Sequence, residues 1–435
     1  MFYNLRQDVK IHKSLDKYYL SFINRNLNTG ENAKGIIEIN ISGYEILSLC
    51  NGKQTEQGII TELLKKYPNE ELEEMVRVFL APFITDGLII IMNNPSDIEL
   101  VKILGSSEYY CPSTIMLELT NYCPLDCVHC YLGKKENEYI RKEDLQPILE
   151  NIVDLGVHYV QLTGGEVMTY PHLEYAIDYL ITHHIQVNVS TSGIMCRDED
   201  LSILSKIKAT GGFIRVSLDG LEETHNQIRR NSKSFNNAVS FLKKAVSLGI
   251  ETQVATCIIN QQCSEIHDLT KLVKSLGVKQ QIFERVYLQG NAESNALDSR
   301  QSLTEFTTLL SELAETFADD RFSIATENTI NGENCGAGYK TYKISYDLEI
   351  TPCIVMNYSL GNLKKEDFRK IIKNNYEKFR SLRIPCRAIC GSCEMLDNCD
   401  GCVAKVIQYK NQVKACHWYK KQNAFKSGGN HYDKN

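Results

Sequence analysis

The first hundred residues combine strand-like and helix-like hydrophobic patterns. Strand composition is found at residues 18–23, 36–41 and 88–92, and helical spacing at 44–50, 56–67 and 70–85. The turn-like sequence Asn28-Thr29-Gly30 separates the first two strands. Strands followed by three helices and a closing strand are typical of a winged-helix-like module. We therefore predict a separate domain over residues 1–100.

The middle of the chain alternates short apolar runs with helical stretches. We predict strands at 115–120, 159–163, 187–191, 213–218, 252–259 and 281–288, and helices at 142–155, 172–183, 199–207, 236–248, 265–276 and 303–317. This alternation predicts an α/β fold with a parallel sheet covered by helices. Because a closed TIM barrel has eight such units, six units predict an open, partial (β/α)6 barrel over residues 101–325.

Unusual residues follow four of the predicted strands at the same end. The first strand leads into Cys123, the second into the sequence 164–166 (Gly-Gly-Glu), and the third into Ser192, while Ser217 closes the fourth. Active sites of barrels lie at the carboxyl ends of their strands. The pattern therefore predicts a functional site at this rim.

Composition excludes several classes of protein. The chain has 435 residues, of which 43% are hydrophobic and 23% are charged, and its net charge is -6. These values are typical of globular proteins and give no electrostatic reason to expect nucleic acid or an anionic membrane as partner. The first residues lack a signal-peptide core, and apolar runs such as 88–92 are far shorter than the ~18 residues that span a bilayer. We expect a soluble cytoplasmic protein.

Cysteine is the exceptional residue type. Of the 16 cysteines, three lie within 123–130 and eight within 335–416, where we predict a Cys-rich domain over 326–435. In a reducing compartment, grouped thiols indicate metal rather than disulfides. The others show no metal spacing and are predicted to be small buried residues: Cys50, Cys111, Cys196, Cys257 and Cys263.

The segment Cys123-Pro-Leu-Asp-Cys127-Val-His-Cys130 is the sharpest motif. Its C-x3-C-x2-C spacing supplies three thiolates from one loop, enough for three irons of a 4Fe–4S cluster, and leaves the fourth iron open for a substrate. A structural zinc site is the alternative, but such sites are closed by four ligands and favour Cys pairs.

This motif after a first barrel strand resembles the radical S-adenosylmethionine (SAM) enzymes. The resemblance implies that Cys123, Cys127 and Cys130 hold a catalytic 4Fe–4S cluster to which SAM binds. The sequence 164–166 resembles the family's GGE motif, so Gly164, Gly165 and Glu166 are expected to meet the methionine amine of SAM. Flexible glycines allow backbone to approach a ligand, and a glutamate pairs with an ammonium group.

Other SAM contacts are implied by the same resemblance. Ser217 matches the position that contacts the ribose, and Arg229 matches an arginine that pairs with the SAM carboxylate. Ser192 stands where many relatives have asparagine and is a further expected contact, while His129 is expected beside the adenine. By themselves, Ser217 reads as an ordinary strand serine and Arg229 as a surface charge.

The C-terminal cysteines resemble the SPASM domain, which carries auxiliary iron–sulfur clusters. Eight thiols suffice for two clusters, which we expect to be 4Fe–4S, although two zincs fit the same count. By the resemblance, the outer cluster is held by Cys390, Cys393, Cys399 and Cys416. The inner cluster is held by Cys335, Cys353 and Cys402, with Cys386 either its fourth ligand or a spare thiol.

The N-terminal module distinguishes between subfamilies. Winged-helix modules often bind DNA, but the third helix begins with acids at positions 70, 71, 73 and 74, which would repel phosphates. The module instead resembles the PqqD-like element that recognises ribosomally made peptides. There the leader peptide is expected to add as a strand to the module's sheet.

Together the three parts resemble the sactipeptide maturases. The resemblance implies an enzyme that uses a 5′-deoxyadenosyl radical to form thioether crosslinks between cysteine sulfurs and carbons of a precursor peptide with an N-terminal leader. It also implies an external reductant such as a flavodoxin or ferredoxin. Three alternatives stay open: a related enzyme that makes a C–C crosslink or an epimerised residue, a sulfatase-maturing enzyme, and a non-catalytic iron–sulfur or zinc protein.

Overall fold

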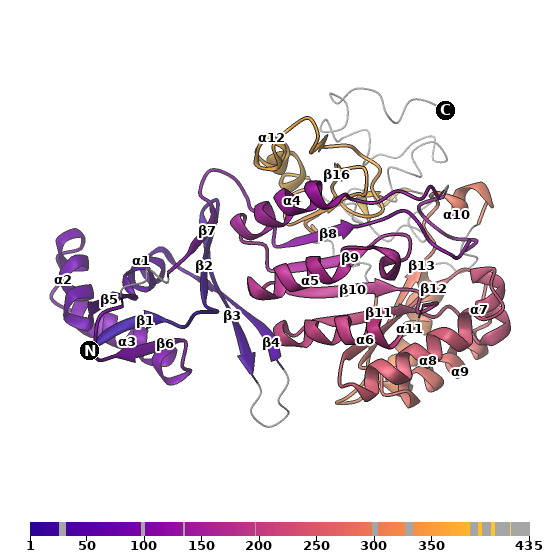
Figure 1. Cartoon of the computed structure of the whole chain (residues 1–435), viewed down its shortest axis with the longest axis horizontal. Helices are drawn as coiled ribbons and strands as arrows, with labels where there is room; N and C mark the ends of the chain where they lie inside the picture. The colour runs from indigo at the N-terminus through magenta and orange to yellow at the C-terminus, as the bar shows by residue number, and fades with distance from the viewer. Residues whose placement is uncertain are drawn as a thin grey trace.

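The computed structural model describes residues 1–25, 32–96, 101–133, 135–195, 197–297, 303–326, 334–382, 390–393, 402–404 and 418. An N-terminal unit, an α/β barrel and a C-terminal segment follow one another along the chain (Figure 1). In these ranges, no helix combines the length and apolarity that crossing a membrane requires. Every described cysteine is a free thiol.

The N-terminal unit consists of two small sheets and three helices. The sheets have the strand orders β5-β1-β6 and β4-β3-β2-β7. Its elements are β1 (Phe2–Leu5), β2 (Lys10–Ser14), β3 (Lys17–Arg25), β4 (Asn32–Ile39), α1 (Ile41–Leu49), β5 (Asn51–Thr55), α2 (Glu56–Lys66), α3 (Leu72–Thr85), β6 (Ile89–Met92) and β7 (Ile103–Ser106). The predicted strands and helices are confirmed, and β1, β2, β5 and β7 are additional strands.

Side-chain caps determine where the first two helices begin. Asn40 Oδ1 accepts a hydrogen bond from Gly43 N at 2.8 Å at the start of α1, and Thr55 Oγ1 accepts one from Gly58 N at 3.1 Å at the start of α2. Such caps satisfy backbone donors that the helix leaves unpaired and contribute about 1 kcal/mol each.

The barrel alternates parallel strands with helices that cover its outside (Figure 1). In chain order it comprises β8 (Thr114–Glu118), α4 (Lys142–Asp154), β9 (Tyr159–Thr163), α5 (Leu173–Thr182), β10 (Gln186–Thr191), α6 (Asp198–Ser205), β11 (Phe213–Ser217), α7 (Glu222–Arg229), α8 (Ser234–Ser247), β12 (Glu251–Ile258), α9 (Cys263–Ser275), β13 (Gln280–Arg285), α10 (Asn291–Ser294) and α11 (Leu303–Phe317). Strands β8 to β13 pair in sequence order, all parallel. The predicted partial barrel of six units is confirmed.

Two further strands extend the barrel sheet beyond the six units. β14 (Ser323–Thr326) pairs with β13, and β15 (Thr341–Ile344) pairs with β8, both in parallel. β15 continues into the antiparallel strands β16 (Glu349–Thr351) and β17 (Gly361–Asn362), which α12 (Phe368–Arg380) follows. The C-terminal segment therefore shares its sheet with the barrel. These strands are too short to give a periodic signal in the sequence.

Successive residues of the barrel strands face alternately the hydrophobic core and a central cavity. Leu117 and Leu162 are fully buried in the main hydrophobic core. The preceding inward residues Met116 and Gln161, together with Arg215, are partly exposed and line the cavity. A packed TIM barrel fills its interior with bulky side chains, whereas this interior leaves room for a ligand.

The N-terminal unit docks at the end of the barrel where the strands begin. Lys34 Nζ donates a hydrogen bond to the carbonyl of His184, just before β10, at 2.6 Å. The His12 ring packs against His158, just before β9, with ring centroids 4.4 Å apart. The predicted site, by contrast, lies after the strands end. The unit and the site are thus at opposite ends of the barrel.

Replacing Gly211 tests this docking. Gly211 has a φ of +71°, and a Cβ there would lie 2.5 Å from the carbonyl oxygen of Asn32 in β4. Gly249 has a similar φ of +66° but nothing within 4 Å, so Gly249→Ala is the matched control. We expect Gly211→Ala to lower the free energy of unfolding by about 1–3 kcal/mol more than Gly249→Ala, because only the first adds a steric clash. Chemical denaturation measures the difference; equal losses would contradict it.

Candidate functional site

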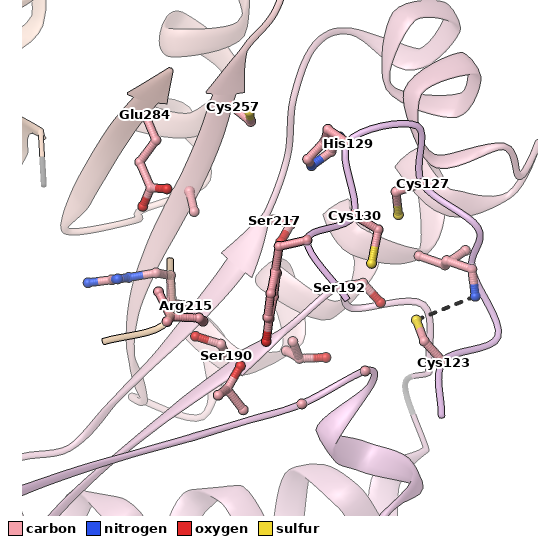
Figure 2. Close-up of a pocket in the computed structure, with 18 of the residues that line it drawn as sticks. Cys123, Cys127, His129, Cys130, Ser190, Ser192, Arg215, Ser217, Cys257 and Glu284 are labelled. Carbon is pink, nitrogen blue, oxygen red and sulfur yellow. Dashed lines mark hydrogen bonds between the residues drawn. The ribbon is translucent and has the colours of Figure 1, made fainter. Parts of the chain in front are cut away.

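A cavity of about 290 Å³ opens at the carboxyl ends of the barrel strands (Figure 2). The loop after β8 forms one side, and inward side chains of the strands form the rest. Most of the predicted site residues line it: Cys123, Cys127, His129, Cys130, Gly164, Gly165, Ser192, Ser217 and Arg229. The structure brings these residues together, and the individual roles assigned to them stay predictions.

The three cysteines of the loop differ in burial. Cys127 is buried, while Cys123 and Cys130 are partly exposed. The backbone N–H of Leu125 donates to Cys123 Sγ at 3.5 Å. Burial raises the pKa of the Cys123 thiol to about 12 and also raises the pKa of Cys130. Iron binding would therefore have to displace a proton from each of these two thiols.

The donor set fits an iron–sulfur cluster better than a single ion. Three thiols on one loop match a 4Fe–4S cluster that has one iron without a cysteine. Within the described part of the chain, no three His, Cys, Asp or Glu side chains gather as ligands of one metal ion. A structural zinc site is closed by four ligands, whereas a cluster can leave one iron without a cysteine. Three cysteines on one loop therefore favour the cluster.

A glycine pair holds the start of the cysteine loop against β9. Gly165 N donates to the carbonyl of Thr120 at 2.6 Å. A Cβ on Gly165 would lie 2.1 Å from the carbonyl oxygen of Tyr122, and one on Gly164 would lie 2.4 Å from that of Thr120. Only residues without a side chain allow this approach. The pair therefore fixes the backbone that leads into Cys123.

The Glu166 carboxylate is engaged inside the protein. Glu166 is fully buried, and one of its oxygens accepts hydrogen bonds from Met168 N at 3.2 Å and Thr191 Oγ1 at 2.6 Å. The other oxygen accepts from both the backbone N–H, at 2.9 Å, and the hydroxyl of Ser192. Glu166 thus positions Thr191 and Ser192, which line the cavity. Its direct contact with SAM stays a prediction.

A buried ion pair stands behind Cys127. Arg229 Nε donates to Asp219 Oδ2 at 2.6 Å, and Arg229 Nη1 donates to Cys127 Sγ at 3.6 Å. His225 Nδ1 accepts the backbone N–H of Asp219 at 3.0 Å. Burial raises the pKa of Asp219, but the charge of Arg229 outweighs it and lowers that pKa to about 2. The ionised Asp219 therefore keeps a guanidinium beside the thiol.

Two asparagines, Asn291 in α10 and Asn295 at its C-terminal end, hold the other side of the cysteine loop. Asn291 N donates to the carbonyl of Cys130 at 2.8 Å, and its side-chain amide donates to that of Cys127 at 2.9 Å. The side-chain amide of Asn295 donates to the carbonyl of Val128 at 2.8 Å. No spacing in the sequence indicates these contacts, which bridge more than a hundred and sixty residues.

His129 lies on the cysteine loop and Ser217 ends β11, and both line the cavity (Figure 2). Burial lowers the pKa of His129 to about 4, so its ring is neutral near pH 7. Among described residues, His129 Nδ1 has no hydrogen-bond partner. An unpaired ring nitrogen beside a cavity is suited to a polar ligand group. This agrees with, but does not test, the expected place of His129 beside adenine.

Three C-terminal cysteines lie near one another. Burial raises the pKa of Cys353 to about 12, and the neighbouring Cys402 and Cys335 raise it further. These three were assigned to the inner auxiliary cluster. Cys393 N donates to the carbonyl of Cys390 at 2.8 Å, so these two predicted outer ligands share a turn. The other predicted ligands lie outside the described residues: Cys386, Cys399 and Cys416.

Some cavity groups have no counterpart in the predicted site. Arg215 and Glu284 line the cavity, and so does Cys257. The prediction that all unassigned cysteines are buried is confirmed for Cys50 and Cys111 but wrong for two others: Cys257, which is partly exposed, and Cys263, which is exposed at the start of α9. Cys196 lies outside the described residues. Cys257 faces inward because inward and outward positions alternate along β12. The apolar composition of the strand hides this alternation in the sequence.

Three protein families match consecutive parts of the chain. Residues 29–89 match coenzyme PQQ synthesis protein D, known as PqqD. Residues 117–273 match the radical SAM superfamily. Residues 335–394 match the iron–sulfur cluster-binding domain SPASM.

Two Bacillus subtilis proteins are similar in sequence. The antilisterial bacteriocin subtilosin biosynthesis protein AlbA is 23% identical, covering 97% of this chain and 97% of its own length. The sporulation killing factor maturation protein SkfB is 25% identical, covering 72% of this chain and 76% of its own. Among solved structures, Streptococcus suis SuiB bound to precursor peptide SuiA has a TM-score of 0.69 at 18% identity, covering 94% of this chain and 97% of that one.

Replacing Gly165 tests how the loop is held. In Gly165→Ala the added methyl would meet the carbonyl oxygen of Tyr122 and displace the backbone before Cys123. We expect cluster retention to weaken about ten- to hundredfold, as when groups that orient metal ligands are lost. Iron and sulfide per chain after anaerobic reconstitution measure this, with Gly249→Ala as the control. Full iron content in Gly165→Ala would contradict the account.

Proposed function

We propose that this chain, a radical SAM enzyme that also carries a SPASM domain and a PqqD-like domain, forms thioether crosslinks in a ribosomally made precursor peptide. The observation that carries this proposal is the similarity to a bacteriocin biosynthesis protein over 97% of both chains. A match that extends across the recognition unit, the barrel and the cluster domain supports a shared class of substrate as well as a shared fold.

The residues of the cavity would divide the work of holding the cofactors. Cys123, Cys127 and Cys130 would bind the catalytic cluster, and SAM would lie beside it. When bound, SAM and the clusters supply a radical that removes a hydrogen atom from a peptide carbon and a path for the electron released when sulfur closes onto that carbon. Arg229, held by Asp219, would keep a fixed positive charge next to the cluster. Such a charge would stabilise negative charge on the cluster without a rearrangement of the protein.

The C-terminal segment forms part of the same cavity wall. Ile354 and Val355 directly follow Cys353, one of the predicted inner cluster ligands, and both line the cavity. An auxiliary cluster held by Cys353 would thus lie next to the reacting peptide. The two apolar side chains also help to exclude water, which a reactive radical requires.

The edge strand β6 is the best candidate for binding a leader peptide. β6 pairs with β1 on one side and ends its three-stranded sheet. It carries exposed Ile90 and Ile91, and the adjacent α3 exposes Met75 and Val78. The opposite edge, β5, has the polar sequence NGKQT. An added peptide strand obtains affinity from the backbone and specificity from apolar side chains, so β6 suits it better.

A substitution on β6 tests this assignment. Ile90 and Leu248 are both 45% exposed, but Leu248 lies on the barrel surface after α8. We expect Ile90→Asp to weaken leader binding roughly tenfold or more, because burial of an isoleucine side chain is lost, while Leu248→Asp has no effect. Fluorescence anisotropy of a labelled leader peptide measures binding. SAM cleavage without peptide should be the same in both variants, and unchanged binding by Ile90→Asp would rule out β6.

Leader and reaction site would then lie at opposite ends of the barrel. The N-terminal unit docks where β9 and β10 begin, whereas the cavity opens where they end (Figure 1). A precursor bound at both places must pass along the barrel, and an extended peptide advances about 3.3 Å per residue. We therefore propose a spacer in the precursor between its leader and the first modified residue.

We further propose that the reaction takes place in the cytoplasm with an external reductant. Twelve described cysteines are free thiols, and iron–sulfur clusters need a reducing environment. A flavodoxin or ferredoxin is the class of donor that would supply electrons.

Mass spectrometry of the precursor tests the proposed reaction. The probe is a synthetic peptide translated from the short cysteine-containing reading frame expected next to the gene, incubated anaerobically with reconstituted enzyme, SAM and dithionite. We expect a loss of two hydrogens per crosslink and cysteines that no longer react with iodoacetamide. Cys127→Ala should form neither crosslinks nor 5′-deoxyadenosine. A loss of two hydrogens with all cysteines still alkylatable would indicate C–C bonds. Uptake of deuterium without the loss of two hydrogens would indicate epimerisation.

A further inference from the structure

A second cavity, of about 510 Å³, lies where the three parts of the chain meet. The N-terminal unit contributes residues of β2, β3 and β4, and the barrel contributes residues around the starts of β8 and β9. Tyr339, Lys340 and Arg380 come from the C-terminal segment. The volume is typical of ligand-binding pockets, which have roughly 300–1,000 Å³. The cluster and SAM are expected at the other end of the barrel, so this cavity is a separate feature.

The walls of this second cavity carry an excess of positive charge. Among the described residues that line it, Glu38 is the one acid, whereas four are cationic: Lys13, Lys17, Lys340 and Arg380. The whole chain has a net charge of -6, so the local excess runs against its composition. A cleft lined by charges of one sign concentrates ions of the opposite sign. The second cavity is therefore suited to an anionic group.

Two of the four cations form ion pairs. Lys17 Nζ lies 2.8 Å from Glu38 Oε1, so these two charges balance each other. Arg380 Nη1 lies 3.9 Å from Glu377 Oε2, and both side chains are exposed. Exposed pairs at such a distance are weak. Because a guanidinium has five N–H donors, Arg380 can bind a further carboxylate and keep this contact.

The other two cations lie over aromatic rings. Lys13 Nζ is 4.6 Å from the ring centroid of Tyr44, and Lys340 Nζ is 5.7 Å from that of Tyr339. A ring face attracts a cation, but the ring has no net charge that would neutralise it. Both ammonium groups therefore keep their positive field while the rings hold them in place.

The buried part of the second cavity is neutral and aromatic. His12 and His158 pack edge to face with ring centroids 4.4 Å apart, and Tyr110 and Tyr339 pack in the same way at 5.2 Å. Burial lowers the pKa of His158 to about 3, so its ring is uncharged near pH 7. Low-dielectric walls of this kind strengthen the attraction between the cations and an anion.

The second cavity lies between the proposed leader site and the barrel. The sheet that contains β2 and β3 stands between β6 and the barrel, and residues of both strands line the cavity (Figure 1). A precursor whose leader is bound at β6 has to pass from the N-terminal unit to the barrel. The spacer of the precursor would therefore run beside these cations.

We propose that the second cavity binds the carboxylate of an aspartate or glutamate in the spacer of the precursor peptide, with Lys13, Lys340 and Arg380 as its cationic contacts. This inference rests on the proposed peptide-modifying function and adds a second point of recognition to it. Holding the spacer at one point would set how far the following residues reach, and so which of them arrive at the reaction cavity.

A double-mutant cycle between enzyme and peptide tests this inference. The probes are two labelled synthetic precursors: the native peptide, and an amide peptide in which each aspartate and glutamate of the spacer is replaced by asparagine or glutamine. The enzyme variant combines Lys340→Gln with Arg380→Gln. Its matched control combines Lys271→Gln with Arg321→Gln, which removes two exposed cations outside the cavity. Fluorescence anisotropy measures binding with SAM present and no reductant.

We expect wild type and the control to bind the amide peptide about five- to tenfold more weakly than the native one, as for loss of partly exposed ion pairs. The cavity variant should bind the native peptide about as weakly and lose most of the preference for it. Added salt should reduce the preference of the wild type. Melting temperature and iron content identify a variant that fails to fold, and the two single substitutions then replace the double one.

Several results would overturn the inference. Equal binding of both peptides by the wild type would do so, as would a spacer without acidic residues or a cavity variant that weakens both peptides equally. Succinate and inorganic phosphate are tested by calorimetry as free anions. Binding of either to wild type but not to the cavity variant, with both peptides bound equally, would show a site for a small anion instead.

The binding readout separates this inference from the proposed function. If the wild-type enzyme binds the native peptide but makes no thioether, the proposed reaction is wrong, yet the cycle still decides whether the second cavity holds a carboxylate of the spacer. If both peptides are bound and crosslinked equally well, the proposed function holds and only this inference fails.

Discussion

The contact between Gly165 and the carbonyl oxygen of Tyr122 sets where the cysteine loop begins. Because no side chain fits between them, the backbone before Cys123 can lie directly against the end of β9. From that point the loop is held by other elements: Arg229 behind Cys127 and Asn291 beside Cys130. The loop that carries the three thiols is therefore held by contacts to backbone and to a buried charge.

The barrel separates recognition from reaction. Its strands begin at the N-terminal unit and end at the cavity, so a precursor peptide would meet the two regions in different places (Figure 1). β15 pairs with β8, and Ile354 and Val355, which directly follow Cys353, line the cavity. The barrel sheet thus continues into the C-terminal segment, and the N-terminal unit contacts the barrel where its strands begin.

Local features of the sequence predict much of this fold and little of its long-range contacts. The six barrel units follow from strand and helix periodicity, and the cysteine loop follows from spacing within eight residues. Asn291 and Asn295 could not be predicted, because their role depends on a loop more than a hundred and sixty residues away. Arg215 and Glu284 look like ordinary charges in the sequence, and only the curved sheet of the partial barrel brings them to one cavity. The expected contact of Glu166 with SAM stays a prediction, and the hydrogen bonds by which its carboxylate holds Ser192 are an additional role that the motif alone does not indicate.

The central claim is that the loop at 123–130 holds a cluster with an open iron that faces the cavity. Electron paramagnetic resonance of the dithionite-reduced enzyme, recorded before and after addition of SAM, tests it directly. The account predicts that SAM changes the signal of one cluster, that the change survives replacement of Cys335 and Cys390, and that it disappears in Cys127→Ala. A signal that SAM leaves unchanged, or a change that persists in Cys127→Ala, would contradict it.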